Sequence, residues 1–374
     1  MHKQAFELCL PPHPDQPQFL NNLANALVAQ FRQGGQQNDL DNIVLLCRQV
    51  VELCLPPHPK QSNFLNNLAN ALLARFEQRG QKNDLDESIS LCRQALELCA
   101  PPHPIGSTIL NNLANALSAR FKQEGQKNDF NESIFLYKQA LELSAPSHHI
   151  RSIILHNLAN ILQNQFAQDQ QNGLDESISL YRQALELCPL SHPNRSEFLN
   201  TLADALRAQF EQGGQQNDID ESILLHRQAV ELCLSPHPKQ SNFLNNLANA
   251  LLARFKQEKQ QNDLDESISL YKQALKLCTP PHPNRSIILN NLAYTLLTQF
   301  KQGGQQNNLD ESISLYKQAL ELCSLPYLDQ LKFFNNFGSA LEARFKQTGH
   351  QNDIDGSVLL HRQAVELCPS PHPN

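Results

Sequence analysis

The sequence predicts an all-α protein, built as a solenoid of antiparallel helix pairs. Three observations lead to this prediction. A His-centred proline turn recurs along the whole chain at a spacing of 45 residues, with one step of 44. Two stretches between consecutive turns follow the helical period of apolar residues. A two-helix hairpin cannot bury its apolar face alone, whereas stacked hairpins bury it continuously, so the repeats are expected to stack.

The proline turns set the boundaries of the repeats. They lie at His13, His58, His103, His148, His192, His237, His282, Tyr327 and His372. Because the register holds from end to end, we expect a single solenoid over residues 1–374, with no second domain. It would consist of a half repeat at 1–14 and full repeats at 15–59, 60–104, 105–149, 150–193, 194–238, 239–283, 284–328 and 329–374.

The first helix of each repeat, helix A, is illustrated by residues 61–78. Its apolar residues are spaced i, i+3, i+4, i+7 and i+11, which is one face of an amphipathic helix. They are Leu65, Leu68, Ala69, Leu72 and Phe76. Gly80 then suits a helix C-cap. Equivalent A helices are expected to begin near residues 16, 61, 106, 151, 195, 240, 285 and 330.

The second helix, helix B, is expected to begin at Asp84 and to run to about Cys99. Asp84 and Glu87 have the spacing of a capping box, so Asp84 is the expected N-cap. The apolar positions include Leu85, Ile89 and Cys92, and the following prolines stop the helix. Residues 2–9 match the end of one further B helix.

Composition excludes several classes of protein. The net charge is −7, charged residues make up only 18% of the chain, and no basic stripe occurs. A nucleic-acid-binding protein needs such a stripe to neutralise phosphates, so no nucleic-acid partner is expected. No apolar run has the length of a membrane span, and the N-terminus lacks the features of a signal peptide. We therefore expect a cytoplasmic protein with no membrane contact.

The repeat resembles the tetratricopeptide repeat (TPR). In the third repeat the matching positions are Leu113, Ala114, Leu117, Ser133, Tyr137, Ala140 and Pro146. The unit is longer than the common 34-residue repeat. In this it is similar to the long TPRs of kinesin light chains and to the TPR arms of fungal CHAT-domain or NTPase multidomain proteins. The resemblance implies a right-handed superhelix whose concave groove is lined by the A helices.

A column of polar residues, mostly asparagines, lies opposite the apolar stripe of the A helices. It comprises Asn22, Asn25, Asn67, Asn70, Asn112, Asn115, Asn157, Asn160, Asp204, Asn246, Asn249, Asn291, Tyr294 and Asn336. A helical Asn costs about 0.5 kcal/mol more than Ala, so a merely solvated face explains the column poorly. Passive copying of one repeat is the alternative. Each amide offers donors and an acceptor without charge, which suits the backbone of an extended peptide.

The predicted function is therefore a non-catalytic protein–protein interaction scaffold that binds an extended peptide or partner protein through this Asn ladder. The resemblance to kinesin light chains implies the same grip. Specificity would come from variable groove positions, namely His156, Gln163, Asn164, Glu197, Asp204, Arg207, Tyr294, Lys332 and Glu342. The groove is not expected to be basic. The Lys/Arg clamp of chaperone-binding TPRs is missing, so no chaperone C-terminus is expected as a ligand.

A second hypothesis is a regulatory or oligomerising arm of a CHAT-peptidase or NTPase-type system, present here without its catalytic module. Solenoids normally end in polar capping helices. Residues 356–368 carry the same apolar face as internal B helices, and the chain starts inside a B helix. This pattern predicts end-to-end self-association or partner binding at the termini.

No enzyme, metal or cofactor chemistry is expected. Most of the ten cysteines occupy one repeat position. Stacked helices are about 8–10 Å apart, beyond disulfide reach, so we interpret these cysteines as buried thiols. The turn histidines are one repeat apart, too far to share a metal ion, and no Cys-x-x-Cys or His-Glu-x-x-His motif occurs. No nucleophile–base constellation is present.

Overall fold

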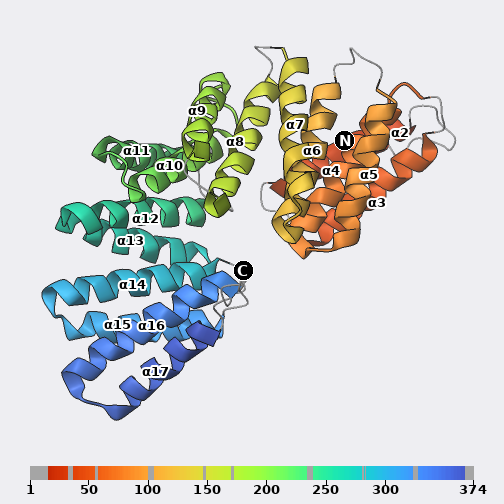
Figure 1. Cartoon of the computed structure of the whole chain (residues 1–374). Coiled ribbons are helices and arrows are strands. Elements are labelled where there is room, and N and C mark those ends of the chain that lie inside the picture. Colours follow the sequence, from red (N-terminus) through yellow and green to blue (C-terminus); the bar gives the residue numbers. More distant parts are fainter. Residues whose placement is uncertain are drawn as a thin grey trace, which may run out of the picture. The chain divides into compact units, whose positions relative to one another are not determined.

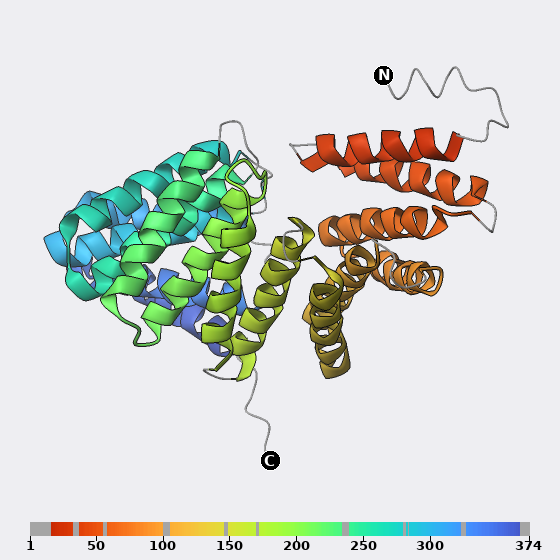
Figure 2. The same cartoon turned by 90° about the horizontal axis from the view of Figure 1, so that it is seen from above.

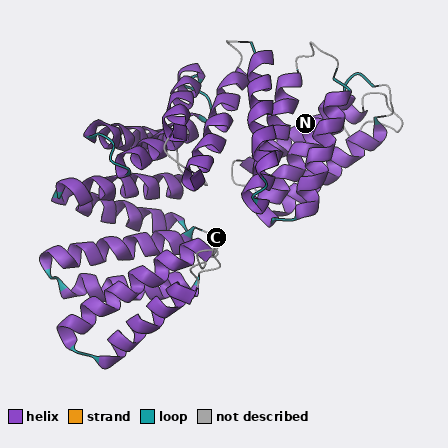
Figure 3. Cartoon of the chain, viewed as in Figure 1, coloured by secondary structure: helices purple, strands orange, loops and turns teal. Residues whose placement is uncertain are grey.

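The computed structural model describes residues 16–32, 37–54, 58–99, 105–145, 149–169, 172–233, 239–279, 282, 284–322 and 327–366. Within these ranges every regular element is a helix (Figures 1 and 3), which confirms the all-α prediction. The expected B-helix end at residues 2–9, and with it the half repeat 1–14, lies outside the described residues.

Helices A and B alternate along the chain as predicted. The A helices are α2 (Gln16–Arg32), α4 (Gln61–Arg79), α6 (Gly106–Glu124), α8 (His149–Asp169), α10 (Arg195–Glu211), α12 (Gln240–Glu258), α14 (Arg285–Gly303) and α16 (Tyr327–Thr348). The B helices are α3 (Gln37–Leu53), α5 (Lys82–Glu97), α7 (Lys127–Leu143), α9 (Asn172–Leu187), α11 (Gln216–Leu232), α13 (Gln261–Leu277), α15 (Gln306–Glu321) and α17 (Gln351–Glu366).

The chain divides into two compact units, Met1–Phe198 and Leu199–Asn374, here called the N-terminal and C-terminal units. An A helix in the interior of each unit packs against the B helix of its own repeat, the preceding B helix and the next A helix. Helix α4 contacts α5, α3 and α6 in this way, and α14 contacts α15, α13 and α16. Figure 2 shows consecutive helices of the N-terminal unit following one another along the stack. Each unit is thus an all-α repeat solenoid; one solenoid over residues 1–374 stays a prediction.

The apolar stripe of helix A forms the core, as predicted. All five predicted residues of α4, from Leu65 to Phe76, are buried. On α5 the predicted residues Leu85, Ile89 and Cys92 are buried as well. Burying one such large aliphatic or aromatic side chain stabilises the fold by roughly 1.5–3 kcal/mol. Because the stripes of neighbouring helices face one another, the core continues from repeat to repeat within each unit.

Gly80 ends helix α4 as predicted. Its φ of 67° lies in the left-handed region, and its N–H donates to the Phe76 carbonyl at 2.7 Å. Glycine adopts this conformation without the steric cost of a Cβ atom. In the sixth repeat Lys259 takes the same role at a φ of 59°, the one described non-glycine residue with positive φ.

The predicted capping box at Asp84 is wrong. Helix α5 begins at Lys82 with Gln81 as N-cap, so Asp84 lies in the first turn. Its buried carboxylate instead accepts two hydrogen bonds from Arg75, at 2.8 and 2.7 Å. We call this pair the Arg–Asp clamp; the same pair joins helices A and B at Arg120–Asp129, Arg254–Asp263 and Arg344–Asp353. The sequence pattern suggested a cap at Asp84 because its actual partner, Arg75, lies on the preceding helix, on the other side of the loop that joins α4 and α5.

Cysteines and turn histidines have structural surroundings. Burial raises the pKa of Cys47 and Cys92 to about 12, so both thiols stay protonated near neutral pH. At His58, His192 and His282 the ring Nδ1 accepts the backbone N–H of the residue two positions on, at 3.1–3.2 Å. Within the described ranges, no group of His, Cys, Asp and Glu side chains is arranged to hold a metal ion. No described helix has both the length and the apolar character needed to cross a bilayer.

Candidate functional site

The predicted site residues form two columns on the A helices. The first column contains Asn22, Asn67, Asn112, Asn157, Asn246, Asn291 and Asn336. The second column, three residues further along each helix, contains Asn25, Asn70, Asn115, Asn160, Asp204, Asn249 and Tyr294. First-column side chains are half-buried, or buried at Asn112, whereas Asn25 and Asn70 of the second column are exposed. The two columns therefore have different surroundings and are considered separately.

The first column joins neighbouring A helices. From Asn67 onward, each of its side chains donates to the amide oxygen of a second, buried asparagine on the preceding A helix, whereas the oxygen of Asn22, on the first described A helix, accepts from Gln18 at 2.9 Å. In the N-terminal unit the bonds are Asn67 to Asn21 at 2.8 Å, Asn112 to Asn66 at 2.9 Å and Asn157 to Asn111 at 3.1 Å. We call this set of bonds, in both units, the amide ladder.

In the C-terminal unit the amide ladder is continuous across the repeats. Bonds between adjacent asparagines on one helix link the bonds between helices. The chain of donors runs from Asn336 through Asn290, Asn291, Asn245, Asn246 and Asn200 to Asp204, with distances of 3.5, 3.4, 3.1, 3.2, 3.3 and 3.1 Å. Chains of this kind polarise one another, and this one ends on a carboxylate.

The amide ladder accounts for part of the asparagine excess. Buried polar side chains need partners, and these amides supply each other. The residue that precedes each first-column position, such as Asn66 or Asn111, takes part although the helical wheel did not assign it a role. The Asn-Asn doublet was the available signal. Each ladder bond uses one donor of an amide that has two, so peptide binding by the first column stays a prediction.

Tyrosines on the B helices orient the second column. The buried hydroxyls of Tyr137, Tyr181 and Tyr271 each donate at 2.6 Å to a second-column amide oxygen, on Asn115, Asn160 and Asn249 respectively. Because the hydroxyl occupies the oxygen, the amide nitrogen of Asn115 and Asn249 is left as a donor for other groups, whereas the Asn160 nitrogen already lies 3.2 Å from His156 Nδ1 and keeps one further N–H.

The first two repeats lack this tyrosine. Cys47 and Cys92 stand in its place and are buried. Asn25 and Asn70 are exposed, and neither side chain forms a hydrogen bond with another described residue. Both amides therefore have donors and acceptors available to a ligand.

Charged groups replace the amides in the fifth repeat. Arg207 donates to Glu211 at 2.7 Å and lies 3.6 Å from Asp204. Burial raises the pKa of Asp204 to about 6. Behind it, burial lowers the pKa of His226 to about 3, so its ring is neutral at physiological pH. The 3.7 Å contact between His226 and Asp204 is therefore not an ion pair there.

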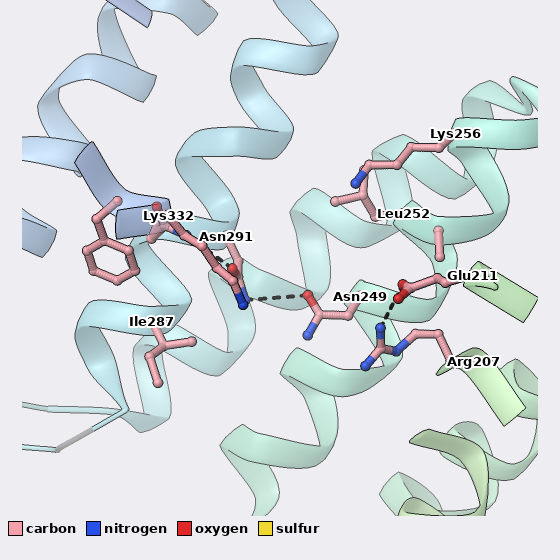
Figure 4. Close-up of a pocket in the computed structure, with 11 residues that line it drawn as sticks. Arg207, Glu211, Asn249, Leu252, Lys256, Ile287, Asn291 and Lys332 are labelled. Atoms are coloured by element: carbon pink, nitrogen blue, oxygen red, sulfur yellow. Dashed lines mark hydrogen bonds and ion pairs between the residues drawn. The ribbon is translucent and has the colours of Figure 1, made fainter. Parts of the chain in front are cut away.

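A cavity of about 290 Å³ lies among α10, α12, α14 and α16 (Figure 4). Three cationic side chains line it, Arg207, Lys256 and Lys332, together with the amides of Asn249 and Asn291. We call it the cationic cavity. The expectation of a groove without basic character is wrong at this place. It failed because the three cations come from different repeats, and Lys256 was not among the predicted specificity positions.

Other predicted specificity positions do not converge on this cavity. His156 is buried, and its ring stacks on Phe198 with centroids 4.2 Å apart. Glu342 pairs with His361 at 3.4 Å. Tyr294 lies close by, since the Lys256 ammonium stands 4.8 Å from its ring centroid.

The tetratricopeptide repeat family model matches residues 63–105 and 242–284. Each match covers the helix pair of one repeat, α4–α5 and α12–α13. The same pair recurs through the described chain. The two matched segments are tetratricopeptide repeats, and the recurring helix pairs are consistent with an array of such repeats, so we call the chain the TPR array. No protein with a curated description matches this TPR array.

Solved structures resemble the TPR array at low sequence identity. The human IFIT1 dimer with PPP-AAAA is 15% identical, with 95% of this chain and 73% of that chain covered and a TM-score of 0.53. A putative kinesin light chain with nearly identical TPR-like repeats, from Podospora anserina, is 21% identical over 58% of this chain and 98% of that chain, with a TM-score of 0.42. At this identity the likeness to IFIT1 shows the fold alone.

Proposed function

We propose that this TPR array is a non-catalytic interaction scaffold that binds an extended peptide, or an extended segment of a partner protein, along the second column. The observation that carries the proposal is the set of second-column amides whose donors remain available. Asn115, Asn160 and Asn249 have their oxygens occupied by tyrosine hydroxyls, and of these three only the Asn160 nitrogen has a second contact, with His156 Nδ1 at 3.2 Å, which leaves it one N–H. Their N–H groups suit the carbonyl oxygens of a peptide backbone.

The spacing of the helices supports an extended ligand. Packed helices are about 8–10 Å apart, and an extended chain advances about 3.3 Å per residue. One second-column amide would therefore meet every third peptide residue. Reading the main chain in this way tolerates many sequences, so side-chain selection must come from positions that differ between repeats.

Charge favours a peptide over a polyphosphate chain. The human IFIT1 structure holds PPP-AAAA, and a phosphate-rich ligand needs cations along its whole path. Here the net charge is −7, and the second column of the N-terminal unit is made of uncharged amides.

The test begins with peptides selected from a random display library on the full chain. Their affinities are measured by fluorescence polarisation for wild type and for the triple variant Asn70→Ala, Asn115→Ala, Asn160→Ala. Losing three amide contacts should weaken binding by about tenfold or more. A matched variant, Gln94→Ala with Gln183→Ala, removes exposed amides from B helices and should bind like wild type. Equal affinity for all three proteins would exclude the second column as the binding surface.

A further inference from the structure

We propose that the cationic cavity of the C-terminal unit binds a carboxylate, supplied by an acidic side chain of the bound peptide. The peptide part of this inference rests on the proposed function. The carboxylate part rests on the charges, the substitution pattern and the donors of the cavity itself.

The charges of the cavity are only partly compensated. Arg207 is paired with Glu211 at 2.7 Å and lies near Asp204. No described acidic side chain forms an ion pair with Lys256 or Lys332. Figure 4 shows Lys332 and Asn291 on one side of the space and Arg207 and Glu211 on the other. A bound anion would therefore meet two ammonium groups that lack a counter-charge.

The substitution pattern points to the same place. Arg207 aligns with Leu73, Ser118, Leu252, Leu297 and Glu342 in other repeats, and no repeat besides the fifth has a basic residue there. Lys332 aligns with Asn63, Thr108, Ile153, Glu197 and Ile287, and no repeat besides the eighth is basic at that position. Two independent departures from the repeat pattern thus bring positive charge to one cavity. Passive copying of a repeat does not produce this convergence.

The neutral lining suits a side-chain carboxylate. The oxygen of Asn249 accepts bonds from Tyr271 at 2.6 Å and Asn291 at 3.4 Å, so its N–H donors are left for a ligand. Leu252, Ile287 and Phe333 supply apolar surface that would contact the methylene groups of a glutamate. A sugar–phosphate chain gains little from apolar surface, so the lining favours an acidic peptide over nucleic acid.

The test compares two labelled peptides of alternating Thr with Glu or with Gln, both acetylated and amidated at the ends. Wild type should bind the Glu peptide about tenfold more tightly at low salt, because two uncompensated lysines meet a carboxylate. The variant Lys256→Gln with Lys332→Gln should remove most of this preference. The control Lys122→Gln with Lys138→Gln makes the same charge change on exposed lysines of the N-terminal unit. This control should keep the preference for the Glu peptide.

The outcomes separate this inference from the proposed function. If Glu and Gln peptides bind wild type equally and the cavity variant changes neither, the carboxylate site is wrong while the scaffold stands. If a Gln peptide with a free C-terminus binds as tightly as the Glu peptide, the cavity binds C-terminal carboxylates and the assignment to an acidic side chain is overturned. Tighter binding of oligoadenylate through the same lysines would overturn the acidic-peptide assignment. Absence of Glu-peptide binding at millimolar concentration would overturn it as well.

Discussion

The same helix face carries only uncharged amides at the second column of the N-terminal unit, whereas the C-terminal unit adds charged groups to its amides. At the second column the N-terminal unit has Asn70, Asn115 and Asn160. The C-terminal unit has Asp204 at the equivalent place, with Arg207 one turn further along the same helix. Both units nevertheless share the amide ladder and the Arg–Asp clamp. The two faces therefore differ in chemistry but not in framework.

This difference separates the polar residues that recur in several repeats from the charged residues that occur in one repeat only. The ladder recurs because each A helix packs on the next one, and the clamp recurs where an arginine of helix A faces the buried aspartate in the first turn of its own helix B. Charges such as Arg207 and Lys332 occur once each, so packing does not require them. We infer that the recurrent polar residues hold the array together, and that the single charged ones determine what it binds.

The largest expected effect comes from breaking the clamp in either unit. Arg120→Ala leaves the Asp129 carboxylate, 4% exposed, without its partner. Arg254→Ala does the same to Asp263, 5% exposed. An uncompensated buried charge costs about 3 kcal/mol, so both variants should lower the free energy of urea unfolding by about that amount. If only one unit lost stability, the framework would not be shared.

The control for the clamp is an ion pair on the B helices. Arg93 and Glu132 are 3.0 Å apart, but their side chains are 52% and 41% exposed. Exposed pairs contribute about 0.2–1 kcal/mol, so Arg93→Ala should change urea unfolding little. A loss equal to that of Arg120→Ala would mean that burial does not explain the clamp.

The next effect concerns the amide ladder. Asn111→Ala and Asn245→Ala remove buried amides from the N-terminal and C-terminal units. Each leaves a donor on the next A helix unpaired, so we expect a loss of about 1–3 kcal/mol in thermal or urea unfolding. Asn70→Ala alters an exposed amide without a described partner and should stay within about 0.5 kcal/mol of wild type. Similar losses at all three positions would contradict the distinction between the columns.

The sequence predicted the features that depend on residues within one repeat, but not the contacts between different repeats. Helix α4 spans Gln61–Arg79, against a predicted 61–78, and Gly80 ends it as expected. Both follow from local spacing within one repeat. The ladder partner of Asn67 is Asn21, on another repeat. A helical wheel of one repeat cannot show that contact, since it depends on how the A helices stack.

The cationic cavity was predicted only in part for the same reason. Arg207 and Lys332 stood out as departures from the repeat pattern, but nothing in the sequence placed them together. Lys256 was overlooked because lysine also occurs at the equivalent positions Lys122, Lys301 and Lys346. Its role comes from its neighbours in space.

A smaller effect should depend on pH and should occur in the C-terminal unit alone. Burial raises the pKa of Asp204 from its usual 3.8 to about 6. Between these values the folded chain holds a proton that the unfolded chain releases. Asp204 therefore favours folding at low pH, and this contribution is lost as the pH rises through about 6.

Asp204→Asn restores the amide found at Asn115 and Asn160 and removes this titration. At pH 7.5 the variant should be more stable than wild type by about 2 kcal/mol, and the gap should close below pH 4. Thermal unfolding of both proteins across this pH range measures the difference in stability. Both proteins contain the neighbouring His226, so its titration largely cancels in that difference. A gap that is constant with pH would show that the Asp204 carboxylate is not destabilised by burial.

The smallest effect tests whether tyrosine hydroxyls matter only where the second column offers an acceptor. Tyr137 donates to Asn115 at 2.6 Å, whereas the buried hydroxyl of Tyr316 has no hydrogen-bond partner among the described residues, since Tyr294 replaces the asparagine in its repeat. Tyr137→Phe should therefore lower the unfolding free energy by about 1 kcal/mol. Tyr316→Phe should leave it unchanged or raise it, because an unpaired buried hydroxyl is costly. Equal losses for both variants in urea unfolding would mean that the hydroxyls act through packing, and that Asn115 is not held by its tyrosine.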